Sequence, residues 1–251
     1  IDLSGGGATV QMYVLTQAGD DRVTGSPRDD IIITGLFGPG DGVDGDDVVN
    51  GGGGNDTISV GDGTNTVHGG AGNDTINGGA GNDTIVLNRM PTIAIPTIIG
   101  GNDGNDVLAI TGTSAGDTVH VFKPSAADIE IDSGAGSVTA TGIHELDLNL
   151  DGGADTATID SLQGSSVVVA SVDAGASDRR SDSVTVNGGS GNDTFTVSGN
   201  DAAAGIEIVH SIAGSSWNGQ VYVKNTTRGD TLTITGGDGN DTIDGGDGRD
   251  A

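Results

Sequence analysis

Residues 42–86 repeat one nine-residue unit five times without a gap: GVDGDDVVN (42–50), GGGGNDTIS (51–59), VGDGTNTVH (60–68), GGAGNDTIN (69–77) and GGAGNDTIV (78–86). Each unit has glycine at or near its first, second and fourth positions, an acid or its amide at the sixth, and an aliphatic residue at the eighth. Because glycine has no Cβ, such a turn can adopt positive φ and bring its carbonyl oxygens together. The last three residues predict a short strand whose eighth-position side chain points inward. These inward residues are Val49, Ile58, Val67, Ile76 and Ile85.

The sixth-position side chain adds a carboxylate to this ring of backbone oxygens. Calcium binds six to eight oxygens from mixed carboxylate and carbonyl sets, whereas zinc prefers His and Cys. The chain has no Cys and only four His. The residue types therefore favour calcium in the turns.

The pattern GGxGxDxUx resembles the RTX, or haemolysin-type calcium-binding, repeat family. The resemblance implies an all-β fold: a right-handed parallel β-roll or β-helix solenoid with calcium ions in its glycine-rich turns. In that roll two units make one coil, so units two apart stack on the same side and share an ion. Carried over to this chain, Asp56 and Asp74 belong to one ladder, and Asp47, Asn65 and Asp83 belong to the other.

One ladder departs from the family pattern at Asn65, which keeps a carbonyl ligand but lacks the charge. We expect weaker binding at the sites it touches, unless Asp62 compensates. Pro27 and Arg28 break the glycine turn before Asp30, which argues against calcium there. The predicted ligands are the side chains of Asp21, Asp30, Asp47, Asp56, Asn65, Asp74, Asp83, Asp106, Asp193, Asp241 and Asp250 and backbone oxygens of Gly69, Ala71, Gly78 and Ala80.

Four sections of one continuous solenoid are predicted: 1–41, an N-terminal cap with degenerate repeats; 42–109, the regular roll with an insertion at 87–100; 110–187, wider rungs; and 188–251, renewed repeats. Strands with period-two alternation recur about every ten residues in the third section and favour further parallel rungs, with an antiparallel sandwich as the alternative. Asp117, Asp155 and Asp182 also precede inward positions there. They are interpreted equally well as turn-capping residues or as ligands.

The insertion LNRMPTIAIPTIIG (87–100) carries two prolines and many apolar residues. One interpretation is a longer rung that covers a face of the solenoid. The alternative is a contact surface for another chain, because exposed apolar patches on a polar protein mark interfaces.

The composition predicts that folding depends on calcium. The chain has 251 residues, of which 48 are Gly and 36 are acidic, and a formal charge of -27. Low aromatic content with high net charge indicates disorder in the ion-free state. Aligned carboxylates repel one another, so binding energy becomes folding energy. Extracellular calcium modules bind at ~0.1 to 1 mM, which predicts a secreted, cell-surface location.

Other functions lack their residues. There is no HExxH, GxSxG or P-loop pattern, so we expect no enzymatic activity in this segment. Nine basic residues against 36 acids predict no nucleic-acid binding. No apolar run is long enough to span a membrane. The four histidines show no metal-ligand spacing and are interpreted as ordinary surface or rung residues.

The sequence therefore predicts a calcium-binding extracellular structural segment of a large secreted or cell-surface protein. By resemblance, such proteins leave the cell unfolded by type I secretion and fold in external calcium. Self-association into a surface layer or filament, or a cell-surface ligand as in an adhesin, are the expected partners. The alternative is the calcium-binding C-terminal module of a type I-secreted enzyme or toxin. A first residue other than Met and a last residue within a repeat favour a fragment of a longer chain.

Overall fold

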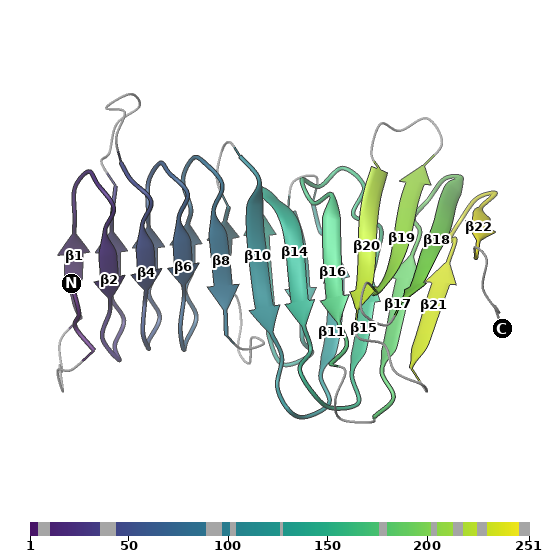
Figure 1. Cartoon of the computed structure of the whole chain (residues 1–251), viewed down its shortest axis with the longest axis horizontal. Helices are drawn as coiled ribbons and strands as arrows, with labels where there is room; N and C mark the ends of the chain where they lie inside the picture. Colours follow the sequence, from purple (N-terminus) through teal and green to yellow (C-terminus); the bar gives the residue numbers. More distant parts are fainter. Residues whose placement is uncertain are drawn as a thin grey trace. The chain divides into compact units, whose positions relative to one another are not determined.

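The chain was analysed as a computed structural model, which describes residues 1–4, 11–35, 44–88, 97–100, 104–125, 128–175, 180–201, 205–212, 218–224 and 230–245. Its named elements are all β-strands (Figure 1). They fall into two compact units, one of residues 1–110 with 135–144 and one of residues 111–134 with 145–251. The division into four sections of one solenoid stays a prediction.

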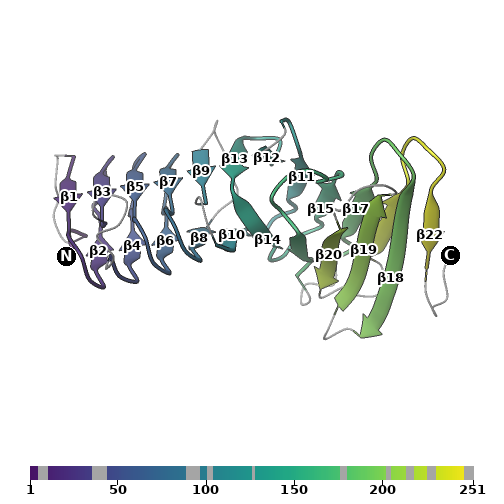
Figure 2. The ribbon, with the colours of Figure 1, turned by 90° about the horizontal axis from the view of Figure 1, so that it is seen from above.

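The first unit is built from two parallel sheets. One contains β1 (Tyr13–Leu15), β3 (Ile31–Ile33), β5 (Thr57–Ser59), β7 (Thr75–Asn77), β9 (Thr97–Ile99) and β13 (Ser137–Thr141), in that order. The other contains β2 (Arg22–Thr24), β4 (Val48–Asn50), β6 (Thr66–His68), β8 (Thr84–Leu87) and β10 (Asp106–Thr111). Figure 2 shows the two rows, with successive strands of the chain alternating between them. The parallel β-roll predicted from the repeat is thereby confirmed.

The core of this unit is a pair of aliphatic ladders between the two sheets. In one sheet Val14, Ile32, Ile58 and Ile76 are in register, and each is at most 5% exposed. In the other, the buried and aligned residues are Val23, Val49, Val67, Ile85 and Leu108. All five inward positions predicted from the repeat are buried, because alternation along a three-residue strand leaves its centre facing the core.

The turns depend on glycine for two different reasons. Gly70 and Gly72 have φ of 101° and 136°, a region in which a side chain would be strained. Gly69 has an ordinary φ, but a Cβ there would lie 2.6 Å from the Oδ2 atom of Asp74. Conformation and close approach together explain the spacing of the glycines in each unit.

The second unit also contains two sheets. One has the order β12 (Asp128–Asp132), β11 (Thr118–Phe122), β15 (Thr156–Ile159), β17 (Ser183–Asn187) and β21 (Thr231–Thr235). The other has the order β14 (Ile143–Asn149), β16 (Val169–Asp173), β20 (Asn218–Lys224), β19 (Gly205–Ile212), β18 (Asp193–Asp201) and β22 (Thr242–Asp244). Most neighbours are parallel, so rungs continue through the loose middle of the sequence.

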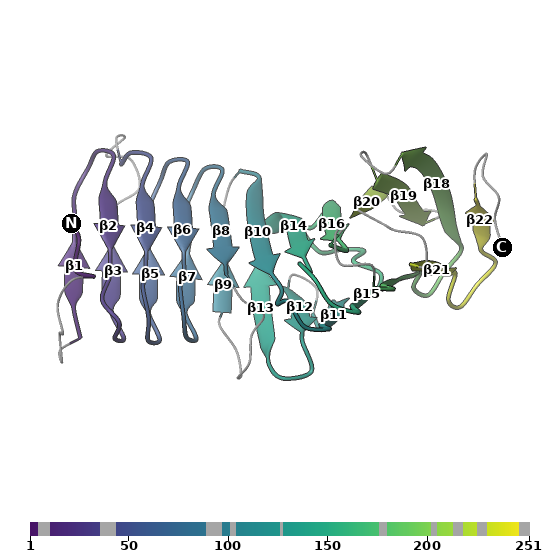
Figure 3. The same ribbon diagram turned by 60° about the horizontal axis from the view of Figure 1, so that its bottom comes forward.

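Three antiparallel pairs interrupt this unit, and the prediction of parallel rungs was wrong for them. β11 pairs antiparallel with β12, and β19 pairs antiparallel with both β18 and β20 (Figure 3). Antiparallel neighbours need only a short connection, whereas parallel neighbours need a long crossover. Only residues 202–204 separate β18 from β19, so a return in the opposite direction is the accessible pairing.

Part of the predicted insertion lies outside the described residues. Residues 89–96 are not described, and β9, at its end, pairs parallel with β7 and β13. The role of the insertion as a contact surface for another chain stays a prediction. In the part of the chain that is described, no helix is long and apolar enough to cross a membrane.

Candidate metal centre in the glycine-rich turns

The sixth-position residue of each regular unit lies immediately before its strand and points into the turn. The glycine turn bends the backbone so that this polar side chain, and not an apolar one, closes the end of the core. The buried members are between 1 and 2% exposed: Asp30, Asp47, Asp56, Asn65, Asp74, Asp83, Asp106 and Asp193. Carboxylates are rarely buried without a partner, which makes this row the leading candidate for a site.

The sixth-position residues form two continuous ladders in the first unit. The backbone N–H of Asp56 donates to Oδ1 of Asp74 at 2.9 Å, and that of Asp30 donates to Oδ1 of Asp56 at 2.7 Å. The second ladder joins Asp21, Asp47, Asn65, Asp83 and Asp106 by the same bond, at 2.9 to 3.0 Å. The structure thus has the same side-by-side pairs that the repeat predicts.

A second set of bonds runs in the opposite direction and was missed by the sequence reasoning. At the fifth position, the N–H of Asn73 donates to Oδ1 of Asn55 at 2.9 Å, so the earlier coil provides the acceptor. Asn82 accepts likewise from the N–H of Asn105 at 2.8 Å. Recurrent Asn before the sixth-position Asp was the available signal. Stacked coils are therefore joined by two sets of hydrogen bonds of opposite direction, one at the fifth position and one at the sixth.

The other carboxylate oxygen lies at the centre of the candidate site. Oδ2 of Asp56 and Oδ2 of Asp83 are buried and have no hydrogen-bond partner among the described residues. A Cβ built on Gly51 would overlap both Oδ2 of Asp56 and the carbonyl oxygen of Gly69. The absent side chain therefore leaves a cradle lined by a carboxylate oxygen and a backbone oxygen.

Burial of these carboxylates disfavours their charged form. It raises the pKa of Asp56 to about 7, with the charges of Asp74 and Asp30 adding to the shift. Burial also raises the pKa of Asp83 to about 6. The pKa values of Asp47, Asp74 and Asp106 are raised by burial as well. Nearby positive charge would reverse this penalty.

The donor set fits calcium. Among the described residues, no group of three or more His, Cys, Asp or Glu side chains is suited to holding a metal. An ion in these turns would need backbone oxygens beside the carboxylates, and calcium accepts such mixed sets. Asp56 and Asp83 would hold it through Oδ2, with glycine carbonyl oxygens completing the shell.

The four predicted carbonyl ligands line these same turns. The carbonyl oxygens of Ala71 and Ala80 each accept a backbone N–H at 2.8 Å, from Gly54 and Gly63. A carbonyl oxygen has two lone pairs, so one remains for a cation. The carbonyl oxygen of Gly69 faces the Gly51 cradle, and that of Gly78 receives a contact from Asn65 at 3.5 Å. Their role as ligands stays a prediction.

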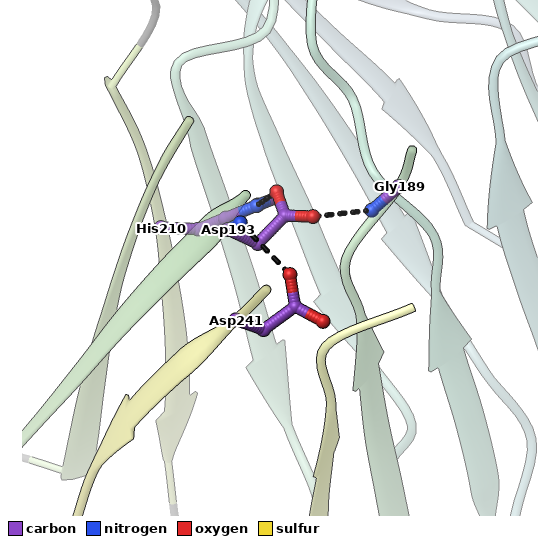
Figure 4. A network of polar contacts seen from close by, with 4 residues as sticks. All are labelled: Gly189, Asp193, His210 and Asp241. Atoms are coloured by element: carbon purple, nitrogen blue, oxygen red, sulfur yellow. Dashed lines mark hydrogen bonds and ion pairs between the residues drawn. The ribbon is translucent and has the colours of Figure 1, made fainter. Parts of the chain in front are cut away.

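The C-terminal repeats show a different arrangement around Asp193 (Figure 4). The N–H of Asp193 donates to Oδ1 of Asp241 at 2.9 Å, as in the other ladders. However, Oδ1 of Asp193 lies 2.7 Å from Nε2 of His210, and its Oδ2 accepts the N–H of Gly189 at 3.2 Å. Both oxygens are thus occupied by the protein itself. Asp250 lies outside the described residues.

A histidine also closes the far end of the second ladder in the first unit. The N–H of Asp106 donates to Nδ1 of His144 at 3.3 Å, where a further Asp would otherwise accept it. His144 ends a ladder as an acceptor, whereas His210 faces a carboxylate at the start of one. Both histidines lie in strands, His144 in β14 and His210 in β19, but sequence spacing alone cannot place them against Asp106 and Asp193.

The loose middle of the chain continues the same bonding in the second unit. The N–H of Asp117 donates to Oδ1 of Asp155 at 2.8 Å. In the same way, the N–H of Asp155 donates to Oδ1 of Asp182, and the N–H of Asp182 donates to Oδ1 of Asp230, both at 2.9 Å. Asp117 also accepts the N–H of Thr113 through Oδ2 at 2.7 Å. Asp117 is thus both a turn cap and a ladder member, and Asp155 and Asp182 are ladder members.

Comparison with known protein families agrees with this geometry. A family model described as "RTX calcium-binding nonapeptide repeat (4 copies)" matches residues 16–36, 41–76, 59–89, 181–201 and 233–251. A search of curated proteins returned no match. The matched segments contain the buried sixth-position residues of both ladders in the first unit, except Asp106. The matched segments are therefore RTX calcium-binding nonapeptide repeats.

Proposed function

We propose that this chain is a non-enzymatic, extracellular structural segment of a large secreted or cell-surface protein, of the adhesin, surface-layer or filament type, that folds when it binds calcium. The observation that carries the proposal is that Oδ2 of Asp56 and of Asp83 is buried without a hydrogen-bond partner in the described part of the chain. The protein provides few cations to neutralise such groups, since it has nine Lys and Arg against 36 acids.

Calcium binding explains why the turns combine buried carboxylates with glycine cradles. An ion bound in the Gly51 cradle stabilises the ionised carboxylate that burial otherwise penalises. Because the cradle forms only when coils stack, binding favours the folded chain over the unfolded one. A protein of this kind stays unfolded where calcium is scarce and folds where it is abundant. RTX repeats are typical of extracellular proteins exported by type I secretion, which fits that behaviour.

The structural role is supported by how the residues are used. Repeated rungs account for most described strands of the first unit, and their side chains go into the two ladders and the aliphatic core. A spacer needs stiffness and length, which stacked coils supply. A calcium-binding module beside a catalytic domain is the rival, and the parent gene separates the two: a catalytic signature upstream favours the module, and many more rungs favour the spacer.

The test is far-ultraviolet circular dichroism during a calcium titration from a chelated start, with magnesium as the control. The proposal expects a cooperative transition from coil to β-structure at roughly 0.1 to 1 mM calcium. Magnesium should not produce it, because it demands a small octahedral shell and dehydrates reluctantly. Unchanged β-structure in chelator would contradict calcium-driven folding.

A further inference from the structure

The unit at residues 60–68 departs from its neighbours twice within one turn. Its first position is Val60 where the three other units between 51 and 86 have Gly, and its sixth is Asn65 where they have Asp. Both residues are buried, Val60 at 0% and Asn65 at 1% exposure. The two changes affect the same place, because the first-position Cβ and the sixth-position side chain share the cradle described above.

The change at the first position fills the cradle. In the preceding unit, a Cβ on Gly51 would overlap Oδ2 of Asp56 and the carbonyl oxygen of Gly69. Val60 carries a real Cβ and two methyl groups at this position. Apolar carbon therefore stands where the neighbouring turns leave a space bordered by oxygens.

The change at the sixth position supplies hydrogen-bond donors. Oδ1 of Asn65 accepts the N–H of Asp47 at 2.9 Å, which fixes the other terminal atom as nitrogen. That Nδ2 donates to Oδ1 of Asp83 at 2.9 Å and reaches the carbonyl oxygens of Gly61 and Gly78 at 3.5 Å each. A neutral amide thus points its positive end at one carboxylate and two backbone oxygens, the kinds of atom that bind calcium.

We propose that the Asn65 amide replaces a calcium ion in this turn, so that the turn at 60–65 is a metal-free closure within a run of calcium-binding turns. The inference rests on calcium binding by the neighbouring turns. It deepens the proposed function by assigning one turn that closes without an ion. The stability of this coil then depends less on calcium than that of the other coils of the roll.

The first test is the number of calcium ions bound per chain, measured by equilibrium dialysis. The double variant Val60→Gly/Asn65→Asp restores the sequence GGDGTD and should bind about one ion more than the wild type. Asp56→Asn is the matched control in the adjacent ladder and should bind about one ion fewer. An unchanged ion count in the double variant, with a lower count in Asp56→Asn, would overturn the inference, because the wild-type turn would then already hold an ion.

A second measurement separates a donor from a ligand without needing the double variant to fold. Asn65→Ala removes the amide, so the melting temperature in saturating calcium should fall while the number of calcium ions bound stays that of the wild type. If Asn65 were instead a calcium ligand, the variant would bind about one ion fewer, which would contradict the inference. Absence of calcium binding by the wild type would instead refute the proposed function itself.

Discussion

Nε2 of His210 lies 2.7 Å from Oδ1 of Asp193, and the two side chains are 3% and 0% exposed. The imidazole stacks on Phe195, with ring centroids 4.3 Å apart. In the regular ladders this Oδ1 accepts a backbone N–H from the coil before it. Because β18 is followed by an antiparallel return, β19 brings a side-chain donor to the same oxygen. The imidazole of His210 therefore takes the place of the backbone N–H that a preceding coil donates in the regular ladders.

Replacing His210 by Ala should destabilise the second unit. The change leaves a buried carboxylate oxygen without its donor, which costs about 1–3 kcal/mol of unfolding free energy. His120→Ala is the matched control, because His120 pairs with Asp160 at 2.8 Å but the two side chains are 43% and 39% exposed. Exposed pairs contribute about 0–1 kcal/mol. Equal losses in denaturant unfolding would show that burial of the Asp193 contact has no special role.

Replacing Asp56 by Asn should have opposite effects with and without calcium. The amide keeps an Oδ1 acceptor for the N–H of Asp30 but removes the buried charge. In chelator, where the wild type is largely unfolded, the folded form of the variant should be favoured by about 1–3 kcal/mol more than that of the wild type, which raises its content of β-structure. In a calcium titration followed by circular dichroism, its midpoint should move to higher calcium on the order of tenfold. A change of the same sign in both conditions would contradict the assigned role of Asp56.

The metal-free chain should gain stability on acidification. The carboxyl of Asp56 has an ordinary pKa of 3.8 and a pKa of about 7 in the fold, so between these values the folded chain binds more protons than the unfolded one. Unfolding free energy therefore falls as pH rises from about 4 to about 7. Asp83, with a pKa of about 6, acts in the same direction over a narrower range.

Far-ultraviolet circular dichroism in chelator at pH 5 and pH 8 measures this dependence, because the calcium-free chain is largely unfolded. The content of β-structure should be higher at pH 5, and Asp56→Asn should reduce the difference. In saturating calcium the sign should reverse, because protons then compete with the ion for the same oxygens. Greater stability at pH 8 in chelator would be the opposite of the expected result.

Two glycines of neighbouring turns, Gly69 and Gly53, should differ sharply in how far replacement by alanine destabilises the fold. A Cβ on Gly69 would lie 2.6 Å from Oδ2 of Asp74, whereas the nearest atom to a Cβ on Gly53 is 3.6 Å away. Gly69→Ala should weaken calcium binding and lower the melting temperature in calcium. Gly53→Ala should be neutral or slightly stabilising, by up to about 1 kcal/mol, through the unfolded chain. Similar melting temperatures for both variants would argue against the cradle.

The nine-residue period carries most of the fold information in the first unit. Stacking of Asp56 on Asp74 and burial of Ile58 and Ile76 follow from a local pattern, because each coil repeats the last. The fifth-position ladder was also visible in the recurrent Asn, although its significance appears only once two coils are placed side by side. The register of the repeat is therefore sufficient to predict both aliphatic ladders.

The second unit was less predictable for physical reasons. The pairing of β19 with β18 and β20 depends on the direction in which the chain returns, which alternation along a strand does not encode. The contact between His210 and Asp193 spans 17 residues with no repeat to align them. Similarly, His144 meets Asp106 across 38 residues. Tertiary placement, and not local pattern, determines these contacts.

The most direct test is anomalous X-ray diffraction from crystals of this chain grown in calcium. The account predicts an anomalous peak at about 2.3–2.6 Å from Oδ2 of Asp56, within the cradle at Gly51. It predicts no such peak beside Nδ2 of Asn65. Calcium-bound crystals with no peak at Asp56 would contradict the central claim that the buried sixth-position carboxylates bind calcium.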